Sequence, residues 1–398
     1  MLKKVAIIGG GILGLAIGYE LSSQNDKYKV VIIEKENVLG KHQSGNNSGV
    51  LHCGLYYQPG SLKAKLAVEG IREMVKFSKN HGISHDICGK IVVATNSSEE
   101  KYLDSLANRG KKNGLKGLKF LSKTELSLRE PNVKATKALL VPEEGIIDYS
   151  RVVDKLADCI RLNNGEIVLD CEVLSSKKIK KNQVTLVTNK FEKNYDLVIS
   201  CSGLYSDRVF SKLIHKKSPL QIIPFRGEYM HVKKQYMDIV NHLVYPVPDS
   251  KFPFLGIHFT RLINGGREVG PNAVLALKRE GYSNKDFSLN DTIEILKYKG
   301  LRNFILKNFG FTINEFVSSF STKAFIQKAK KLIPSSERYM FEKGGTAGVR
   351  AQAISKSGEL LMDFNILREK NQIHVLNAPS PGATASLSIA KHIISNYI

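Results

Sequence analysis

The stretch that decides the fold is Gly9-Gly10-Gly11-Ile12-Leu13-Gly14. It follows the short apolar run Lys4–Ile8 and opens a second apolar run, Ile12–Leu21, which contains closely spaced alanine and glycine. This is a GxGxxG motif between an expected strand and an expected helix. Its first glycine permits a tight turn, its second lets a pyrophosphate approach the backbone, and its third lets the helix pack on the strand. The stretch predicts a βαβ unit whose helix N-terminus binds a dinucleotide.

Glu34 adds a second part to this pattern. It lies 20 residues after Gly14, at the end of the apolar run Val30–Ile33, where a carboxylate can bind ribose hydroxyls and disfavours the 2′-phosphate of NADP. The polar stretch His42–Gly49 follows this strand directly and can wrap a long cofactor, which favours FAD over NAD. The residues expected at the cofactor are Gly9, Gly11, Ile12, Leu13, Gly14, Glu34, Lys35, Ser44, Asn47 and Ser48.

The composition excludes several classes of protein. A chain of 398 residues with 42% hydrophobic residues can bury a large core, so it is not a disordered tail, a collagen-like fibre or a disulfide-stabilised miniprotein. Its 59 Lys and Arg residues against 37 Asp and Glu residues give a net charge of +22, which suits nucleic acid, an anionic membrane, an anionic substrate or a lysine-rich surface. The basic clusters Lys177–Lys181 and Lys328–Lys331 lack interleaved aromatic residues, so we expect no nucleic-acid partner.

The cysteines and histidines do not indicate a disulfide framework or a metal site. The five cysteines form an odd set without a CxxC pair, which favours a reducing compartment. His81 and His85 have helical spacing, but Gly82 separates them and no carboxylate pair lies nearby, so we expect no metal. The basic and apolar N-terminus imitates a secretory signal, but its patterned glycines argue against one. We expect a cytoplasmic protein, soluble or peripheral on the inner face of the membrane.

The order of apolar runs predicts a mixed α/β chain with two architectures. The segment 220–277 is rich in strands and punctuated by proline and glycine, which indicates antiparallel pairing. Asp148 is expected to cap a helix over 149–162. Other helices are expected at 61–80, 99–112 and 290–329 and after Gly382, and strands at 90–95, 165–174, 184–188, 195–200 and 373–376. We predict a Rossmann-like cofactor domain (1–85, 145–215 and 340–398) interleaved with an antiparallel-sheet substrate domain (86–144 and 216–339).

Longer motifs run along nearly the whole chain. The first reads Gln43-Ser-Gly-Asn-Asn-Ser-Gly-Val-Leu-His-Cys-Gly-Leu-Tyr-Tyr57, followed by Pro59-Gly-Ser-Leu-Lys-Ala-Lys65. The others lie at 88–95, 201–208, 223–229, 245–248, 252–261, 270–276, 348–352 and 374–380. Together they resemble the L-2-hydroxyglutarate oxidases and dehydrogenases of the D-amino-acid-oxidase-like flavoprotein superfamily. One departure is Gly382, where the family pattern has alanine.

The resemblance implies a D-amino-acid-oxidase-like fold and FAD as cofactor, held either covalently or non-covalently. The implied reaction is oxidation of the C2 hydroxyl of L-2-hydroxyglutarate, a dicarboxylate, to 2-oxoglutarate. The electrons would pass to oxygen or to a membrane quinone. Two alternatives remain open at this point: a related flavin enzyme acting on glycerol 3-phosphate or a secondary amine, and a flavin-containing RNA-associated protein suggested by the positive charge.

The resemblance and the chemistry together suggest three catalytic candidates. His52 is the expected base for the hydroxyl proton, because imidazole titrates near neutral pH; a covalent link to the flavin and a structural role are its alternatives. Arg350 matches a position that holds a substrate carboxylate in related amine oxidases, although a structural ion pair is the other reading. His258 is expected on the strand Leu255–Arg261, three residues from Arg261. An odd separation places two side chains on opposite faces of a strand, so His258 ranks above Arg261.

The remaining site residues follow from the same resemblance. Tyr57, Arg261 and Thr384 are candidates for substrate binding. The flavin contacts carried over are Val173, Ser202, Gly203, Gly382 and Ala383. The segment 382–384 could place backbone N–H groups against the electron-rich end of the flavin, as an oxyanion hole would, or could be only a tight helix start.

Overall fold

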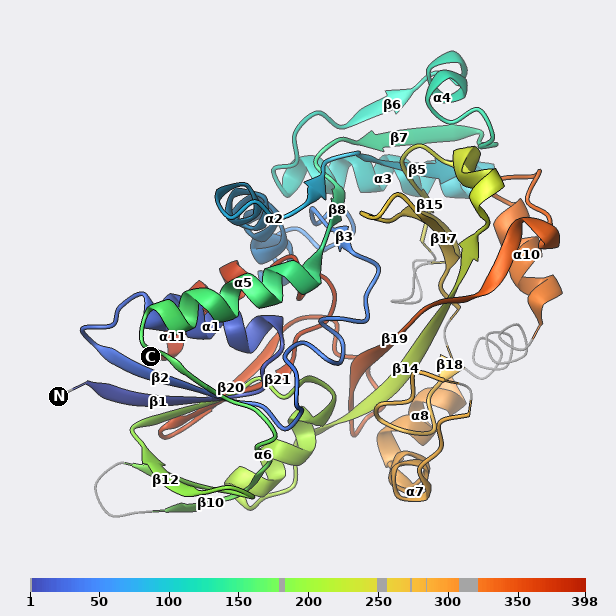
Figure 1. The fold of residues 1–398 in the computed structure, drawn as a ribbon. Coiled ribbons are helices and arrows are strands. Elements are labelled where there is room, and N and C mark those ends of the chain that lie inside the picture. The colour runs from blue at the N-terminus through green and yellow to red at the C-terminus, as the bar shows by residue number, and fades with distance from the viewer. Residues whose placement is uncertain (1, 179–182, 249–255, 273, 284, 308–320) are drawn as a thin grey trace.

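The computed structural model describes residues 2–178, 183–248, 256–272, 274–283, 285–307 and 321–398. Parts of several predicted segments fall outside them, namely 179–181 of a basic cluster, 252–255 and 273 of two motifs, and 308–320 of a helical segment. Two large sheets organise the chain. In Figure 1 the first lies on the left, beside both termini, and the second lies on the right.

The first sheet is the βαβ unit predicted from the glycine motif, extended to six strands. Its order is β20-β21-β13-β1-β2-β9, and all neighbours are parallel except β20 against β21. The helix α1 (Ile12–Ser22) connects β1 to β2, which confirms the prediction. The strands are β1 (Lys3–Ile8), β2 (Tyr28–Ile33), β9 (Glu166–Val168), β13 (Leu197–Ser200), β20 (Asn365–Glu369) and β21 (Gln372–Asn377).

Alternation along β1 explains why both faces of this sheet are covered. Val5 and Ile7 pack with the helices α1, α5 (Tyr149–Leu162) and α11 (Ser386–Tyr397), whereas Ala6 and Ile8 pack against the small sheet β10-β11-β12. Figure 1 shows the helices on one side and the small sheet on the other. The strands of the small sheet are β10 (Val173–Lys178), β11 (Val184–Thr188) and β12 (Glu192–Tyr195). The helix α6 (Ser206–Ile214) comes later in the chain, after β13.

The predicted strand over 165–174 is wrong as a single element. The chain forms β9 and β10 there, and these two strands join different sheets. Asp170 separates them with a positive φ of 50°, so the backbone turns between the strands. The alternating pattern continued through the turn and therefore hid it.

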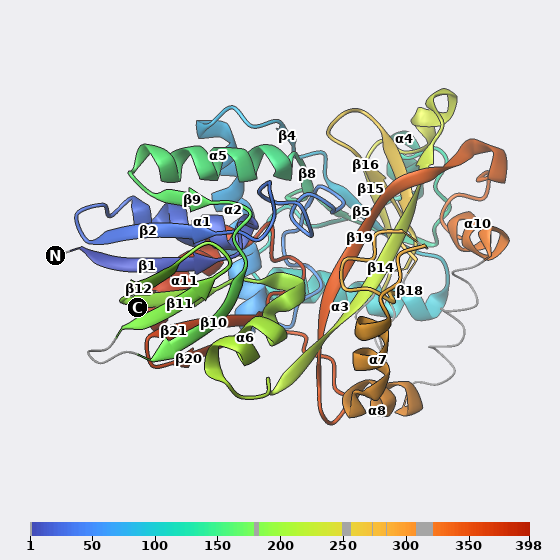
Figure 2. The same cartoon turned by 60° about the horizontal axis from the view of Figure 1, so that its bottom comes forward.

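The second sheet contains the antiparallel strands predicted over 220–277. Its order is β18-β14-β17-β16-β15-β5-β7-β6, with β19 paired to β14. β19 falls within the segment 340–398 that was assigned to the cofactor domain, yet it pairs with β14 along its length in this second sheet. Figure 2 shows the two strands as one long ribbon. The strands are β5 (Lys90–Ala94), β6 (Lys119–Leu121), β7 (Lys137–Val141), β14 (Leu220–Val232), β15 (Leu243–Pro246), β16 (His258–Arg261), β17 (Arg267–Gly270), β18 (Val274–Leu275) and β19 (Phe341–Ser355).

Helices and a small sheet complete the structure. The helix α5 starts where predicted, because the Asp148 carboxylate accepts hydrogen bonds from the N–H groups of Ser150 and Arg151. The other helices are α2 (Leu62–Asn80), α3 (Ser97–Lys112), α4 (Lys123–Arg129), α7 (Leu289–Lys297), α8 (Lys299–Lys307) and α10 (Thr322–Lys330). Short 3₁₀ turns lie at Gly203–Tyr205, Lys234–Ile239 and Arg338–Met340, and the small sheet comprises β3 (Val50–Leu51), β4 (His85–Asp86) and β8 (Gly145–Ile147). Within the described residues, no helix has the length and apolar character needed to cross a bilayer.

The glycine turn is closed by direct backbone packing. A Cβ at Gly14 would lie 2.1 Å from the carbonyl oxygen of Gly9, and Gly9 itself has a φ of 110°. Gly11 is different, because a Cβ there would meet only the Ser44 hydroxyl, at 3.2 Å. Gly14 therefore sets how closely α1 packs on β1, while Gly11 leaves space beside the helix start.

We expect Gly14→Ala to destabilise the fold much more than Gly11→Ala. The methyl group at position 14 meets backbone that cannot move away, and overpacking of this kind costs about 1–3 kcal/mol. Replacing Gly11, an N-cap residue, by alanine should cost roughly 1 kcal/mol or less. Urea unfolding of both variants without added ligand measures the difference. Equal unfolding free energies for the two variants would contradict this account of Gly14.

Candidate active site

A cavity of about 770 Å³ lies where the two sheets meet. The glycine turn, the loop after β2, the β14–β19 ribbon and the segment before α11 all contribute to its wall. Three of the predicted site residues, Gly14, Tyr57 and Arg261, are not part of the wall. The predicted residues that line it are Gly9, Gly11, Ile12, Leu13, Glu34, Lys35, Ser44, Asn47, Ser48, His52, Val173, Ser202, Gly203, His258, Arg350, Gly382, Ala383 and Thr384.

At one end of the cavity, polar side chains brace the glycine turn. The Glu34 carboxylate accepts hydrogen bonds from the N–H groups of Gly10 at 2.6 Å and Glu36 at 2.9 Å. The Ser44 hydroxyl accepts from the N–H of Ile12 at 2.9 Å. These contacts hold the end of β2 and the following loop against the start of α1. They leave a carboxylate at the cavity wall, where the ribose of a dinucleotide would bind.

Helix starts at the cavity differ from helix starts elsewhere. Side-chain caps close α2, α3, α4, α5, α7 and α10. The helices α1, α6 and α11 begin at the cavity wall, and none of the three has a side-chain cap hydrogen bond. In addition, α1 and α11 carry no acidic residue in the first turn. The helix dipole gives these starts a partial positive charge, which suits an anionic ligand.

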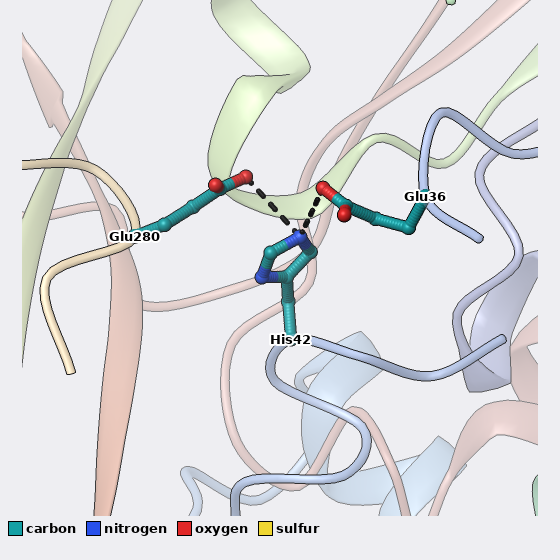
Figure 3. A group of neighbouring side chains, drawn as sticks. All are labelled: Glu36, His42 and Glu280. Carbon is teal, nitrogen blue, oxygen red and sulfur yellow. Dashed lines mark hydrogen bonds and ion pairs between the residues drawn. The ribbon is translucent and has the colours of Figure 1, made fainter. Parts of the chain in front are cut away.

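Three side chains close to the cofactor end form a charged cluster, shown in Figure 3. His42 Nε2 lies 3.0 Å from Glu36 and 3.2 Å from Glu280, and the three possible ligand atoms lie within 4.8 Å of one another. Lys35 also forms ion pairs with both carboxylates, and Lys41 pairs with Glu36. Burial would raise the pKa of Glu36, but these cations outweigh it and hold that pKa at about 2. Because the lysines already neutralise these carboxylates, we interpret the cluster as an ion-pair contact between two loops. The expected lack of a metal site stays a prediction.

At the other end of the cavity lies His52. Its Nδ1 is 3.6 Å from the carboxylate of Glu144, and its backbone N–H donates to the Thr384 hydroxyl at 3.2 Å. That hydroxyl also shares a 2.6 Å hydrogen bond with Tyr149. Thr384 was expected to bind substrate; its hydroxyl instead supports the backbone at His52, while the residue still lines the cavity. With Nδ1 turned toward Glu144, Nε2 is the nitrogen available to a ligand.

Two buried residues that the sequence did not indicate stand behind His52. Glu144 is 1% exposed and Lys90 is fully buried, and they form an ion pair of 2.7 Å. Burial would raise the pKa of Glu144, but the Lys90 ammonium and His52 outweigh it and hold that pKa at about 2. Glu144 directly precedes β8 and Lys90 is the first residue of β5. Only the alternation of β5, which places Lys90 on the same face as Val92, could have indicated that Lys90 points into the core.

His258 lies across the cavity with a different environment. Its ring stacks on Tyr245 with centroids 3.8 Å apart, and its Nδ1 donates to the carbonyl of Gly256 at 2.9 Å. Burial lowers the pKa of His258 to about 3, and the nearby positive groups of His52, Lys90 and Arg350 act in the same direction. His258 is therefore neutral and offers Nε2 as a hydrogen-bond acceptor.

Arg350 lies on β19, paired in register with Phe225 of β14. Burial lowers the pKa of its guanidinium, while the hydroxyls of Tyr229 and Tyr57 act in the opposite direction. Tyr57 is behind the cavity wall, where its hydroxyl bonds to Ser380 and its ring lies 4.6 Å from the ammonium of Lys63. Arg350 is thus a cation at the wall, with Tyr57 beside it and not in the cavity.

Arg261, like Tyr57, is a predicted substrate residue that lies outside the cavity wall. Its guanidinium lies 3.2 Å from Asp86 and donates to the carbonyl of Asn241 at 3.0 Å. His258 and Arg261 are the two ends of β16, and their odd separation turns them to opposite sides, as the sequence analysis expected. Only His258 faces the cavity.

Comparisons with known proteins agree with this geometry. The family model described as "FAD dependent oxidoreductase" matches residues 4–395. An L-2-hydroxyglutarate dehydrogenase of Indibacter alkaliphilus is 46% identical, covering 97% of this chain and 96% of the relative. The protein of the same name from Escherichia coli K12 is 39% identical, covering 98% of this chain and 92% of the relative.

Solved structures share the fold. L-α-glycerophosphate oxidase from Mycoplasma pneumoniae, with FAD bound, has a TM-score of 0.77 at 24% identity and covers 99% of this chain and 94% of its own. Glycine oxidase from Geobacillus kaustophilus has a TM-score of 0.73 at 17% identity, and the match covers 99% of this chain and 94% of the oxidase. The fold predicted from the sequence motifs is confirmed. The chain belongs to the family of FAD-dependent oxidoreductases, and its cofactor is FAD.

Proposed function

We propose that this protein oxidises L-2-hydroxyglutarate to 2-oxoglutarate. The observation that carries the proposal is the pairing, in one cavity, of a carboxylate-supported histidine, His52, with a partly buried arginine, Arg350. Oxidation of a 2-hydroxyacid needs a base for the hydroxyl proton and a cation for the carboxylate. The names of the relatives, which match almost the whole chain, support the choice of L-2-hydroxyglutarate among 2-hydroxyacids.

The cavity fits FAD at the end formed by the glycine turn. We propose that the N–H groups at the start of α1 bind the pyrophosphate, which Ser202 and Gly203 also approach. Glu34 would bind the ribose, and Val173 would lie at the adenine. The segment Gly382–Thr384, at the start of α11, would hold the flavin end. Bound FAD supplies a two-electron acceptor for the hydride that leaves C2 of the substrate.

His52 is a better base than His258 on electrostatic grounds. A base becomes a cation when it accepts the hydroxyl proton. Glu144 lies 3.6 Å from Nδ1 of His52 and stabilises that cation. His258 has no such support, because burial and the neighbouring positive groups lower its pKa to about 3. We propose that His52 accepts the proton at Nε2 and that neutral His258 accepts a hydrogen bond from the substrate.

Anaerobic reduction of the bound flavin tests the reaction. We expect L-2-hydroxyglutarate to bleach the oxidised flavin absorbance, and the D enantiomer, glycerol 3-phosphate and secondary amines to leave it unchanged. Bleaching by one of those compounds, with none by L-2-hydroxyglutarate, would point to a related oxidase. RNA that co-purifies with a flavin unreactive to every hydroxyacid would instead favour an RNA-associated role.

Arg350 and Arg261 provide a matched test of carboxylate binding. Arg350→Met should raise KM for L-2-hydroxyglutarate by roughly 10- to 100-fold, because hydrogen bonds to a charged group contribute about 1.5–3 kcal/mol. Arg261→Met removes the same charge from a side chain outside the cavity and should leave KM within about twofold of the wild type. Flavin reduction at increasing substrate concentration measures both. A larger effect from Arg261→Met would reverse their proposed roles.

We also propose that the electrons pass to oxygen or to a membrane quinone. For contact with the membrane we propose one face of α7. Leu289, Ile293 and Leu296 repeat at helical spacing on α7 and are 61%, 40% and 54% exposed. Phe287 and Leu277 extend this α7 face. Exposed basic residues surround it, namely Lys285, Lys297, Lys299, Arg302 and Lys307. An apolar stripe bordered by cations suits an anionic lipid surface.

Vesicle co-sedimentation tests the α7 face. Leu289→Glu and Leu296→Glu should each weaken binding to phosphatidylglycerol-containing vesicles by roughly tenfold, since burying a leucine contributes about 1.5–3 kcal/mol. Leu128→Glu is the matched control, because Leu128 is 80% exposed on α4, away from this face. Unchanged binding in both α7 variants, or an equal loss in Leu128→Glu, would contradict the proposed contact.

A further inference from the structure

Lys90 is an unusual residue to find at the core of this site. Its side chain is fully buried and forms an ion pair with Glu144 at 2.7 Å. The rings of Tyr56 and Tyr245 lie 4.4 Å and 5.0 Å from the same ammonium. Burying a lysine is costly unless it is paired. Its position, at the first residue of β5 and outside the cavity wall, means that it acts on the substrate only through other residues.

Glu144 is the link between Lys90 and His52. One carboxylate oxygen, Oε2, lies 2.7 Å from Lys90 and 3.6 Å from Nδ1 of His52. The other, Oε1, accepts from the backbone N–H of Cys53 at 3.3 Å and from its thiol at 3.2 Å. The carboxylate is therefore held from three directions, and its remaining contact is the imidazole.

The charges of this group have a simple consequence. A lone buried carboxylate beside His52 would stabilise the imidazolium so strongly that the histidine would stay protonated and could not act as a base. Paired with Lys90, the carboxylate still lies 3.6 Å from Nδ1 of His52, but its net charge is cancelled. The histidine can then be oriented without being trapped as a cation.

We propose that Lys90 is a positioning residue which, through Glu144, sets the tautomer of His52 and the pH at which His52 becomes a base. This inference rests on the proposed function. It explains why a lysine and a glutamate are buried together behind the cavity wall, where two apolar side chains would pack with less cost.

Other groups around His52 also bear on its protonation. Positive or titratable neighbours are His258 and Arg350, which are electrostatically coupled across the cavity, and the thiol of Cys53. The tyrosines Tyr149 and Tyr245 are buried and Tyr56 and Tyr57 partly so, and loss of solvent raises the pKa of each above its usual value. These phenols stay neutral near pH 7. The fixed charges that can be varied by mutation without touching the substrate are thus Glu144 and Lys90.

The test is the pH dependence of kcat/KM for flavin reduction in the FAD-loaded enzyme. In Lys90→Met, the acid limb should move to higher pH by roughly one to two units, because the carboxylate is no longer neutralised. In Glu144→Gln, the limb should move to lower pH, and the plateau should fall by at least about tenfold because Nδ1 loses its oriented acceptor. The double variant removes both charges, so its limb should return to near the wild-type position with the plateau still low.

Controls separate this inference from the proposed function. Lys137→Met removes a lysine that pairs with Asp104 outside the cavity, and it should leave the pH profile unchanged. His52→Gln should abolish the acid limb; if it does not, the base has been misassigned, whatever Lys90 does. If wild-type flavin is not reduced by L-2-hydroxyglutarate, the proposed function fails. If the wild type is active and Lys90→Met and the double variant both keep the wild-type profile, the role of Lys90 is overturned. Should Lys90→Met alone not fold, the comparison of Glu144→Gln with the double variant still decides: the acid limb should be at lower pH in Glu144→Gln and near the wild-type position in the double variant.

Discussion

The rest of the structure depends on the backbone contact between Gly14 and Gly9. Because no Cβ separates them, α1 begins directly at the end of β1, and its N-terminal amides face the space between the two sheets. Glu34 and Ser44 then brace this turn from the neighbouring strand and loop. The cofactor end of the cavity is thus formed by the main chain of the glycine turn together with the side chains that brace it.

The substrate half is assembled differently, from side chains that reach the cavity along separate strands. His52 follows β3, His258 begins β16 and Arg350 lies within β19. Each is supported by a contact behind it: Glu144 for His52, Tyr245 for His258, and the β14 register for Arg350. His258 and Arg350 thus come from the second sheet and His52 from the small sheet, while the first sheet positions the glycine turn.

Sequence reasoning was most successful where the rules are local. The glycine turn and the start of α5 at Asp148 depend only on nearby residues, and both were predicted. The run 165–174 was not divided correctly, and β19 was missed, because the sheet that a strand joins is decided by partners far along the chain. Gly348 pairs with Gly227 of β14, a partner more than 100 residues away that no local pattern indicates. Lys90 gave no local sign of its role, because its partner Glu144 is also far away along the chain. The roles of the individual site residues remain proposals.

The helix starts without side-chain caps have a consequence for stability. They form part of the cavity wall, and a ligand that binds only the folded chain stabilises it. Occupancy by FAD and the free energy of unfolding therefore rise together.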